Sequence, residues 1–414
     1  NSSEEYKDKF NFMIRKQVTH LKNEIERSEI VYNKMISCSA LVLAGLSYKD
    51  ELFLSYGLNL LRKIITSSFD NENFPKSRSF RQLVFYFKYF TLIRELLKDS
   101  RTDIPVYLDE IIFYLGQSYS VFWKSAKHVY LFNGSKEADY KDFDEYLDAH
   151  GYKFSYQKKE VGGYAFIDNS ENSIAVDLGS PPEKKFSETY QSGALSFEFT
   201  YLKNKIICNS GYFQSQKHQL NNISRSTAAH STLTLNNTSV CNFKLGNYNK
   251  KYVDKSFKVF EKKILKNKDK WVIEARHDGY KKKFGVIHHR IIEYYPKQFR
   301  LIGSDNIINS KKKMTNSFEI RFHLYPGAKA TKTIDGKIIL IEIGNSGWKF
   351  KCDNNLIDVE TGLYFGKKSS YTENQNIYIY GEATETHKKI NWEFIKIWKE
   401  KLTQHLFRFP IKKI

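Results

Sequence analysis

The stretch Arg225-Ser-Thr-Ala-Ala-His230-Ser-Thr-Leu-Thr-Leu235 places a histidine at the start of an alternating strand. Strand side chains alternate between two faces, so the leucines of this stretch would take the buried face and its last two threonines the opposite one. The Asn236-Asn237 pair that follows predicts a turn. His230 therefore lies where a rigid sheet can aim its ring, either into a working site or beside a core.

Short alternating runs, broken by Gly, Asn and Asp, continue this pattern from Gly162 onward. Many short strands at close intervals predict an antiparallel β-sandwich. After them, the spacing around Trp392 and Trp398 predicts a helical tail. The clearest predicted strands are 164–167, 173–178, 195–201, 205–208, 231–235, 271–276, 286–295, 299–302, 318–324 and 338–343.

The first part of the chain, residues 5–120, carries apolar residues three or four apart, which predicts successive helices. Gly45 and Gly57 are expected near helix ends, and Thr102-Asp-Ile-Pro105 is expected to cap a helix that runs through Val121. Helices joined by short loops form a bundle or part of an α/α toroid. We therefore predict an α+β multidomain chain. Its parts are a helical domain (α/α toroid part) at 1–135, a connector at 136–160, a β-sandwich domain at 161–390 and a helical tail at 391–414.

The charge balance indicates a basic protein. The 414 residues contain 66 Lys+Arg against 46 Asp+Glu, a formal net charge of +20. Such a surface suits a polyanion, although scattered lysines are also typical of a compositional bias. Charge alone favours nucleic acid, but no basic-aromatic motif supports it, so no nucleic-acid partner is predicted. No apolar run reaches the roughly 18 residues that a membrane-spanning helix needs.

The cysteines and histidines are the side chains most suited to binding a metal ion. The four cysteines lie far apart and show no metal-ligand spacing, which predicts buried thiols. His277 and His323 lie at or beside predicted strands, as His230 does, so the three rings could converge on one face of a sheet. The Asp-Gly pair after His277 also suits a hairpin turn. His288 and His289 should point to opposite faces, so at most one of them can join a site.

Several motifs, taken together, resemble the heparinase II/III-like polysaccharide lyases. The Arg225–Thr232 stretch is the most specific of them, and the likeness runs from about residue 12 to 395. The resemblance implies an α/α toroid followed by an antiparallel β-sandwich, with the site in the cleft between them. The other motifs are Ser77-Arg78, Leu131-Phe-Asn-Gly134, Gly162-Gly-Tyr164, Ala194-Leu-Ser-Phe-Glu198, Asn209-Ser-Gly-Tyr212, His277-Asp-Gly-Tyr280, Phe284-Gly-Val-Ile-His288 and Phe322-His-Leu-Tyr-Pro-Gly327.

The chemistry that this resemblance implies is β-elimination from an acidic, uronate-containing, glycosaminoglycan-like polysaccharide. The carboxylate must be neutralised, a base must take the C5 proton, and an acid must protonate the leaving O4. The expected setting is the cell envelope or periplasm, with a cytoplasmic location left open. The residues expected to carry the reaction are Tyr190, His230 and Arg225; those expected to bind substrate are Gln191, Lys76, Arg78, Asn133, His277 and His323.

Some expected roles have alternatives. His230 is expected to build the site or to bind a metal, with zinc or another divalent ion as the cofactor that the resemblance allows. Arg225 is expected either to clamp a substrate carboxylate or to form a salt bridge that orients the loop before His230.

The chain departs from the family pattern at three places. The segment Ser187-Glu-Thr-Tyr-Gln-Ser-Gly193 contains no histidine, so Gln191 falls on the metal-side histidine and Thr189 on the catalytic one. Asn73-Phe-Pro-Lys76 replaces a Gly-Gly-His, and Ser125-Ala-Lys127 replaces an acidic Gly-Asp-Gly. A non-catalytic glycan-binding or envelope-maintenance protein on the same scaffold is therefore the alternative to a lyase.

Overall fold

The computed structural model describes residues 3–28, 31–125, 128–155, 158–246, 250–254, 256–310, 315–353, 356–367 and 370–397. The chain divides into two compact units. The helical unit comprises Asn1–Lys76, Arg81–Ser120 and Tyr140–Tyr156, and the β unit comprises Ser77–Phe80, Val121–Asp139 and Gln157–Ile414. These boundaries interleave along the chain, whereas the sequence predicted one continuous helical domain up to residue 135.

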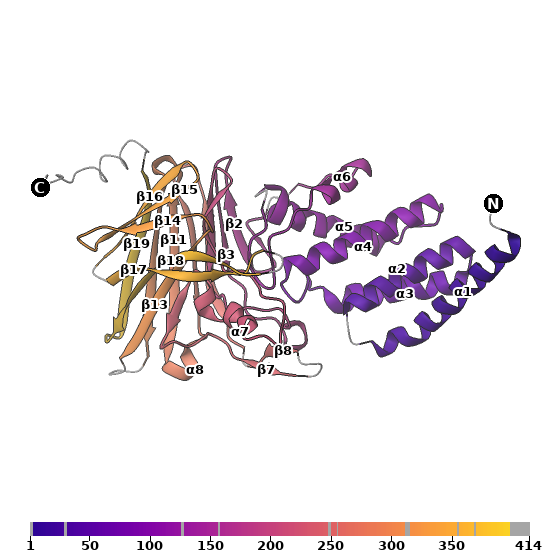
Figure 1. Ribbon diagram of the computed structural model, residues 1–414, viewed down its shortest axis with the longest axis horizontal. Coiled ribbons are helices and arrows are strands. Elements are labelled where there is room, and N and C mark those ends of the chain that lie inside the picture. The colour runs from indigo at the N-terminus through magenta and orange to yellow at the C-terminus, as the bar shows by residue number, and fades with distance from the viewer. Residues whose placement is uncertain are drawn as a thin grey trace, which may run out of the picture. The chain divides into compact units, whose positions relative to one another are not determined.

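The helices lie where their apolar spacing predicts them (Figure 1). The Asp50 carboxylate caps α3 by accepting hydrogen bonds from Leu52 N and Phe53 N at 3.0 and 3.1 Å. The predicted position of the α5 cap is confirmed, because the N-cap is Pro105, although no side chain donates or accepts a capping hydrogen bond there. The helices are α1 Glu4–Glu24, α2 Val31–Tyr48, α3 Glu51–Ser68, α4 Phe80–Asp99, α5 Val106–Tyr119 and α6 Lys141–Ala149.

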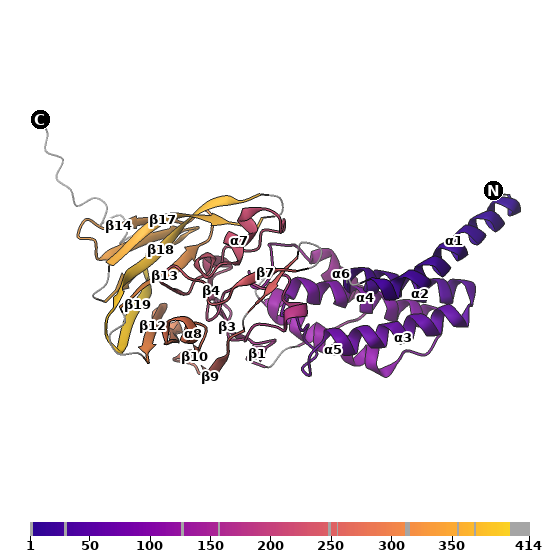
Figure 2. The ribbon, with the colours of Figure 1, turned by 90° about the horizontal axis from the view of Figure 1, so that it is seen from below.

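Gly45 lies in the last turn of α2, as predicted, whereas Gly57 lies well inside α3, so its predicted place near a helix end is wrong. A Cβ on Gly45 would lie 2.5 Å from Leu54 N, and one on Gly57 would lie 2.8 Å from Val42 Cγ2. Both glycines therefore serve close approach of the two helices, which run side by side in both ribbon views (Figure 2).

The β unit contains two large antiparallel sheets and a small one (Figure 1). The first sheet has the order β1 (Glu160–Val161), β2 (Tyr164–Asp168), β3 (Asn172–Asp177), β4 (Phe197–Tyr201), β5 (Asn204–Cys208), β13 (Asn316–Leu324), β18 (Thr372–Ala383) and β17 (Leu356–Tyr364), with β6 (Leu233–Leu235) paired to β13. The second has the order β14 (Lys329–Lys332), β15 (Ile338–Ile343), β16 (Ser346–Cys352), β19 (His387–Ile397), β12 (Arg300–Asn309), β11 (Val286–Tyr295), β10 (Trp271–His277) and β9 (Val259–Lys266). Strands β7 (Phe243–Leu245) and β8 (Lys251–Val253) form the small sheet.

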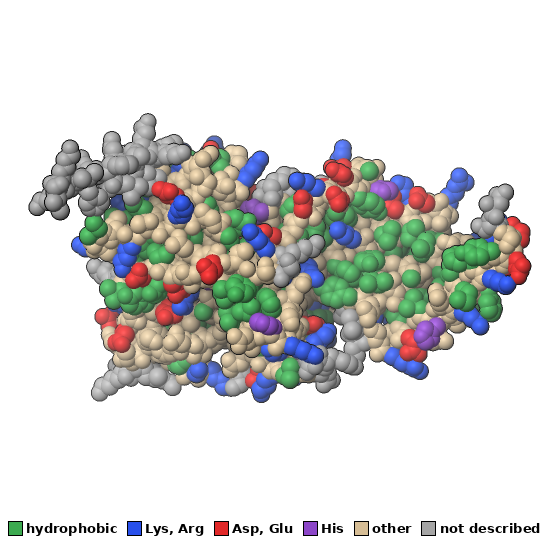
Figure 3. Space-filling view, in the orientation of Figure 1, with side chains coloured by type: hydrophobic (Ala, Val, Ile, Leu, Met, Phe, Trp, Pro, Cys, Tyr) green, Lys and Arg blue, Asp and Glu red, His purple; other side chains and the backbone are tan. Residues whose placement is uncertain are grey.

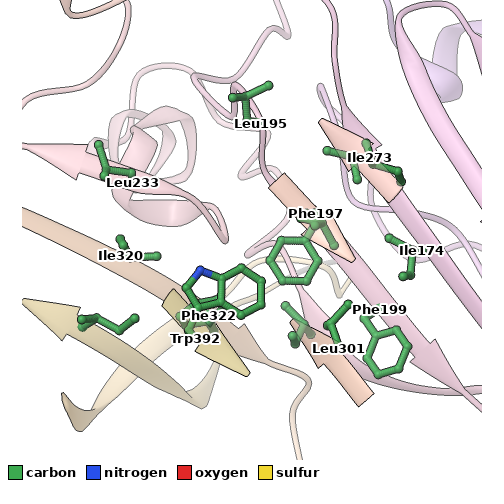
Figure 4. Close-up of a cluster of buried hydrophobic side chains, with 14 of the residues drawn as sticks. Ile174, Leu195, Phe197, Phe199, Leu233, Ile273, Leu301, Ile320, Phe322 and Trp392 are labelled. Atoms are coloured by element: carbon green, nitrogen blue, oxygen red, sulfur yellow. The ribbon is translucent and has the colours of Figure 1, made fainter. Parts of the chain in front are cut away.

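Aromatic side chains join the two large sheets in one core (Figure 4). Phe197 of the first sheet stacks on Trp392 of the second, with ring centroids 5.6 Å apart. Phe322 of the first sheet contacts the same indole edge-on at 4.8 Å. Helices followed by antiparallel sheets are thus confirmed, and the core between the sheets makes the β unit a rigid support for the loops at its edges.

The helical tail predicted from residue 391 is wrong over 391–397, which end strand β19. Ile390, Trp392 and Phe394 are buried and their neighbours are not, so the apolar period here is two. The remainder of the predicted tail, 398–414, lies outside the described residues. Within the described part of the chain, no helix is long and apolar enough to cross a membrane.

Candidate functional site in the β unit

His230 lies between a short helical segment, which its sequence did not predict, and a strand, which it did. The helix α7 (Gln219–Arg225) and a turn of 3₁₀-helix at Thr227–Ala229 precede it, and β6 follows on the edge of β13. The predicted turn is confirmed, because Asn236 and Asn237 adopt φ angles of 48° and 50°. The ring is thereby fixed at the edge of the first sheet.

The His230 ring is buried and neutral. Its Nδ1 lies 2.8 Å from Ser226 O, which assigns the proton to Nδ1 and leaves Nε2 as an acceptor. Nε2 is buried and finds no partner among the described residues. Burial lowers the pKa of His230 to about 4. Gly193 permits this placement, since a Cβ there would lie 2.7 Å from the ring Cδ2.

Gln191, which was expected from the sequence to replace a metal-side histidine, holds several loops together through its amide. Its Nε2 donates to Ser224 O at 2.6 Å and to Gly211 O at 3.0 Å, while its Oε1 accepts from Gly134 N at 3.0 Å. The Asn133 Oδ1 accepts from the backbone N of Gln191 at 3.2 Å. Gln191 and Asn133, both expected to bind substrate, are thus brought together, and the Gln191 amide is committed to the protein backbone.

Arg225 is buried and donates to three backbone carbonyls. They are Tyr190 O at 2.8 Å, Lys251 O at 3.0 Å and Ser187 O at 3.0 Å. Its guanidinium lies 3.8 Å above the ring centroid of Phe243. Burial lowers the pKa of Arg225 below its ordinary value. No carboxylate among the described residues pairs with it, so the geometry matches neither the expected clamp nor the expected salt bridge. The guanidinium instead holds three backbone segments together.

Tyr190 presents an unsatisfied hydroxyl. The side chain is fully buried, and its OH has no hydrogen-bond partner among the described residues. Burial, reinforced by the charge of Asp177, raises the pKa of Tyr190 well above 10. The phenol therefore keeps its proton at neutral pH, which suits a proton donor better than a base.

Arg78 and Lys76 lie in different units. Arg78 belongs to the β unit, where its NH2 lies 2.5 Å from the buried Asp177 carboxylate and its guanidinium stacks 4.6 Å from the Tyr164 centroid. Lys76 belongs to the helical unit, where its Nζ donates to Ser67 O at 3.0 Å.

His323 shares the loop network of His230. Its Nε2 lies 2.9 Å from Ala228 O and its Nδ1 lies 3.2 Å from Ser210 Oγ, so Nε2 carries the proton and Nδ1 accepts. Burial, with the nearby charge of Arg321, lowers the pKa of His323 to about 3. The neutral ring therefore fastens the segment that leads into His230.

His277 belongs to a separate chain of hydrogen bonds between strands of the second sheet. Gly279 N donates to His277 Nδ1, His277 Nε2 donates to His288 Nδ1 at 3.1 Å, and His288 Nε2 donates to Asp305 at 2.6 Å. Asp305 accepts, so the proton of His288 lies on Nε2. Its Nδ1 therefore accepts in turn, and the proton of His277 also lies on Nε2. His289, on the opposite face, pairs with Glu274 instead, which confirms the predicted divergence of the two neighbouring histidines.

Arg290 connects this chain to the His230 stretch. Its Nε and NH2 bind the two oxygens of Asp305 at 2.7 and 3.0 Å, and its NH1 donates to Ser231 O at 2.7 Å. Trp392 Nε1 donates to the same carboxylate at 2.8 Å. Burial acts to raise the pKa of Asp305, but the charge of Arg290 and the His288 hydrogen bond outweigh it and hold that pKa well below its ordinary range.

The donor set does not fit a metal ion. His230 offers one nitrogen, the Gln191 amide is used by the backbone, and both ring nitrogens of His323 are hydrogen-bonded. Among the described residues, no group of three or more His, Cys, Asp or Glu side chains could hold a metal. The reaction proposed below therefore uses no metal ion.

The sequence reasoning missed the buried charges that support these loops. Asp305 and Arg290 were not singled out, and neither was the buried pair Glu198–Lys205, whose Nζ–Oε2 distance is 2.8 Å. Glu198 also accepts from Leu131 N at 2.9 Å and so fastens the Leu-Phe-Asn-Gly segment to β4. A charged residue inside an otherwise apolar strand, as in Phe197-Glu198-Phe199, is the signal that could have found such a pair.

Comparison with known proteins agrees with this architecture. A heparan sulfate lyase, HepC from Pedobacter heparinus, superimposes with a TM-score of 0.72 over 91% of this chain and 62% of its own, at 12% identity. A heparinase III structure gives a TM-score of 0.77 over 94% of this chain and 62% of its own, at 13% identity. Among curated proteins, FtsZ-localized protein C of Caulobacter vibrioides (strain NA1000 / CB15N) is 24% identical in an alignment 247 residues long, and the match covers 56% of this chain and 42% of that protein.

The chain thus spans less than two thirds of the length of these relatives. The family model described as "Heparinase II/III-like, C-terminal" matches residues 156–393, more than half of the chain and most of the β unit. The resemblance carried by the Arg225–Thr232 stretch is therefore confirmed, and the chain belongs to the heparinase II/III-like family.

Proposed function

We propose that this protein is a polysaccharide lyase-like protein of the cell envelope or periplasm, which cleaves an acidic, uronate-containing glycan by β-elimination. The observation that carries the proposal is the similarity to a heparan sulfate lyase across 91% of the chain, so that both the helical and the β part take part in it. The same similarity supports the finer description of the helices as part of an α/α toroid and of the two sheets as a sandwich.

The charge of the chain is consistent with an anionic substrate. The formal net charge is +20. On the face shown in Figure 3, Lys and Arg side chains are scattered and do not gather in one block. A scattered positive surface attracts a polyanion over a long range without selecting its sequence, and salt screens that attraction.

The predicted site residues differ in whether their polar atoms are already hydrogen-bonded. Tyr190 and His230 each keep one polar atom without a partner, so they remain the candidates for proton transfer. Arg225 and Gln191 bind backbone atoms and would act by holding that loop. The residues whose substrate-binding role stays a prediction are Asn133, Arg78, Lys76, His277 and His323.

A second candidate function is glycan binding without cleavage. The specific observation in its favour is burial: Tyr190 is 0% exposed and His230 is 1% exposed, although a base must reach the sugar. The curated relative is named for its localisation with FtsZ and not for a reaction.

The experiment that separates the two is incubation with a panel of alginate, heparan-like and bacterial acidic polysaccharides. Absorbance in the ultraviolet band of an unsaturated uronate reports cleavage, and calorimetry at two salt concentrations reports binding. Product formation from one polysaccharide supports the lyase. Binding without product supports the second function, and binding to DNA that is stronger than to any glycan would exclude both.

Tyr190→Phe gives an unusually clean test of a catalytic role for the phenol. Because the wild-type hydroxyl is buried without a partner, its removal should leave the free energy of unfolding unchanged or raise it by about 1 kcal/mol. If Tyr190 transfers a proton, kcat should fall by about 10²- to 10⁴-fold in the same variant. Chemical unfolding and the absorbance assay measure the two effects, and unchanged kcat would remove Tyr190 from the mechanism.

A further inference from the structure

A carboxylate held by two phenols lies at a groove of the β unit. Glu137 follows the Leu-Phe-Asn-Gly segment, and its backbone N donates to Gly366 O at 2.8 Å. Its Oε1 accepts a hydrogen bond from the Tyr325 hydroxyl at 2.8 Å and a second one from the Tyr364 hydroxyl. One carboxylate oxygen is therefore fixed by two donors from different strand ends.

The second oxygen of Glu137 is left for a ligand. Among the described residues, no hydrogen bond or ion pair reaches Oε2, and the side chain is only half-buried. A groove of about 470 Å³ is lined by Glu137, Ala138, Asp139 and Lys367. A glutamate that only held this segment in place would not need a carboxylate oxygen without a partner beside a groove.

The phenols are built to remain donors. Tyr364 is buried, and it packs with Leu131 and Cys208 in an apolar cluster that Tyr325 contacts. Burial raises the pKa of both phenols above their ordinary value, and the Glu137 charge adds to this. The two hydroxyls therefore stay protonated and donate hydrogen bonds to the Glu137 carboxylate. Hydrogen bonds to a carboxylate are stronger than those between neutral groups.

We propose that Glu137, in place of the fully buried Tyr190 and His230, is the proton-transfer residue, with Tyr325 and Tyr364 as its positioning residues; this inference rests on the lyase function proposed above. The Glu137 Oε2 takes the proton from C5 of a uronate sugar, and the C5–H electron pair forms the C4=C5 double bond. The C4–O4 bond breaks, and the departing O4 takes the proton back from Glu137. Lys367, on the same groove, neutralises the sugar carboxylate during the step.

The test is Glu137→Gln, which keeps the size of the side chain and an oxygen for the two phenols but removes the base. With the polysaccharide that the wild-type protein cleaves best, kcat should fall by about 10²- to 10⁴-fold, while the Kd for the same polysaccharide stays within a few-fold. Tyr364→Phe, which removes only one positioning donor, should lower kcat less than Glu137→Gln does, with the Kd again within a few-fold of the wild-type value.

Glu373→Gln provides the matched control, because it makes the same chemical change on an exposed carboxylate of β18 and should leave kcat unchanged. Thermal unfolding verifies that each variant is folded; should Glu137→Gln fail that check, Tyr364→Phe decides the matter by its kcat. A wild-type protein that cleaves while Glu137→Gln keeps full kcat overturns the assignment of Glu137 alone. A wild-type protein that forms no unsaturated product from any polysaccharide overturns this inference and the proposed lyase function together.

Discussion

Replacing Asp305 with alanine is expected to lower the free energy of unfolding by about 3–5 kcal/mol. The carboxylate is fully buried and accepts from His288, from Trp392 and, through both oxygens, from Arg290. Its removal leaves the buried Arg290 guanidinium without a counter-charge, and that uncompensated charge accounts for most of the loss. Urea unfolding at neutral pH, followed by tryptophan fluorescence, measures the change.

Asp269→Ala is the control for this effect. Asp269 pairs with Lys297 at 2.7 Å, but the two side chains are 75% and 76% exposed, so the pair should contribute nothing measurable to stability. An Asp305→Ala protein as stable as the Asp269→Ala protein would show that the Asp305 network does not hold the sheet. Asp305→Asn should fall between them, because it keeps the shape of the carboxylate and loses its charge.

Acid is expected to destabilise the protein steeply between about pH 6.5 and 4. The pKa of His230 lies near 4 and that of His323 near 3, and the pKa values of His277 and His288 are also lowered, in each case chiefly by burial. The folded protein therefore binds fewer protons than the unfolded chain. The stabilisation is complete above the ordinary histidine pKa of about 6.5 and is lost as the pH falls towards the folded values.

The slope gives a quantitative check. Each such histidine changes the free energy of unfolding by at most about 1.4 kcal/mol per pH unit, so the four together give at most about 5.5 kcal/mol per unit. Urea unfolding at intervals between pH 7.5 and 4.5 measures this slope. His230→Gln and His323→Gln should each reduce proton uptake on unfolding by about one. A free energy that stays flat from pH 7.5 to 5 would contradict the burial of these rings.

Local pattern predicted the helices and most strands because each has a clear apolar period. The end of the chain shows where that reasoning failed: Trp392 was assigned to a helix, although its apolar neighbours alternate with a period of two. The place of Gly57 inside α3 is not predictable from local pattern, because the close approach of α2 that it permits leaves no mark on that pattern. Such long-range effects require the fold itself.

The family resemblance and the strand after His230 were predictable, and the hydrogen bonds around them were not. The Arg225–Thr232 stretch carried the family resemblance, and it leads into β6, which pairs with β13. The partners of Arg225 were not predictable, because they are backbone carbonyls that no side-chain pattern encodes. The Glu137 groove was missed for a related reason: Tyr325 and Tyr364 lie 188 and 227 residues away from Glu137 along the chain.

The histidine chain also acts as a check on strand alignment. His277 lies directly opposite His288 in the pairing of β10 with β11, and Arg290 lies opposite Asp305 in the pairing of β11 with β12. A slip of one residue in either pairing would turn every side chain of the shifted strand to the other face. A slip between β10 and β11 would separate His277 from His288, and one between β11 and β12 would leave the buried Asp305 carboxylate and the buried Arg290 guanidinium without each other. Misaligned sheets are thereby penalised during folding.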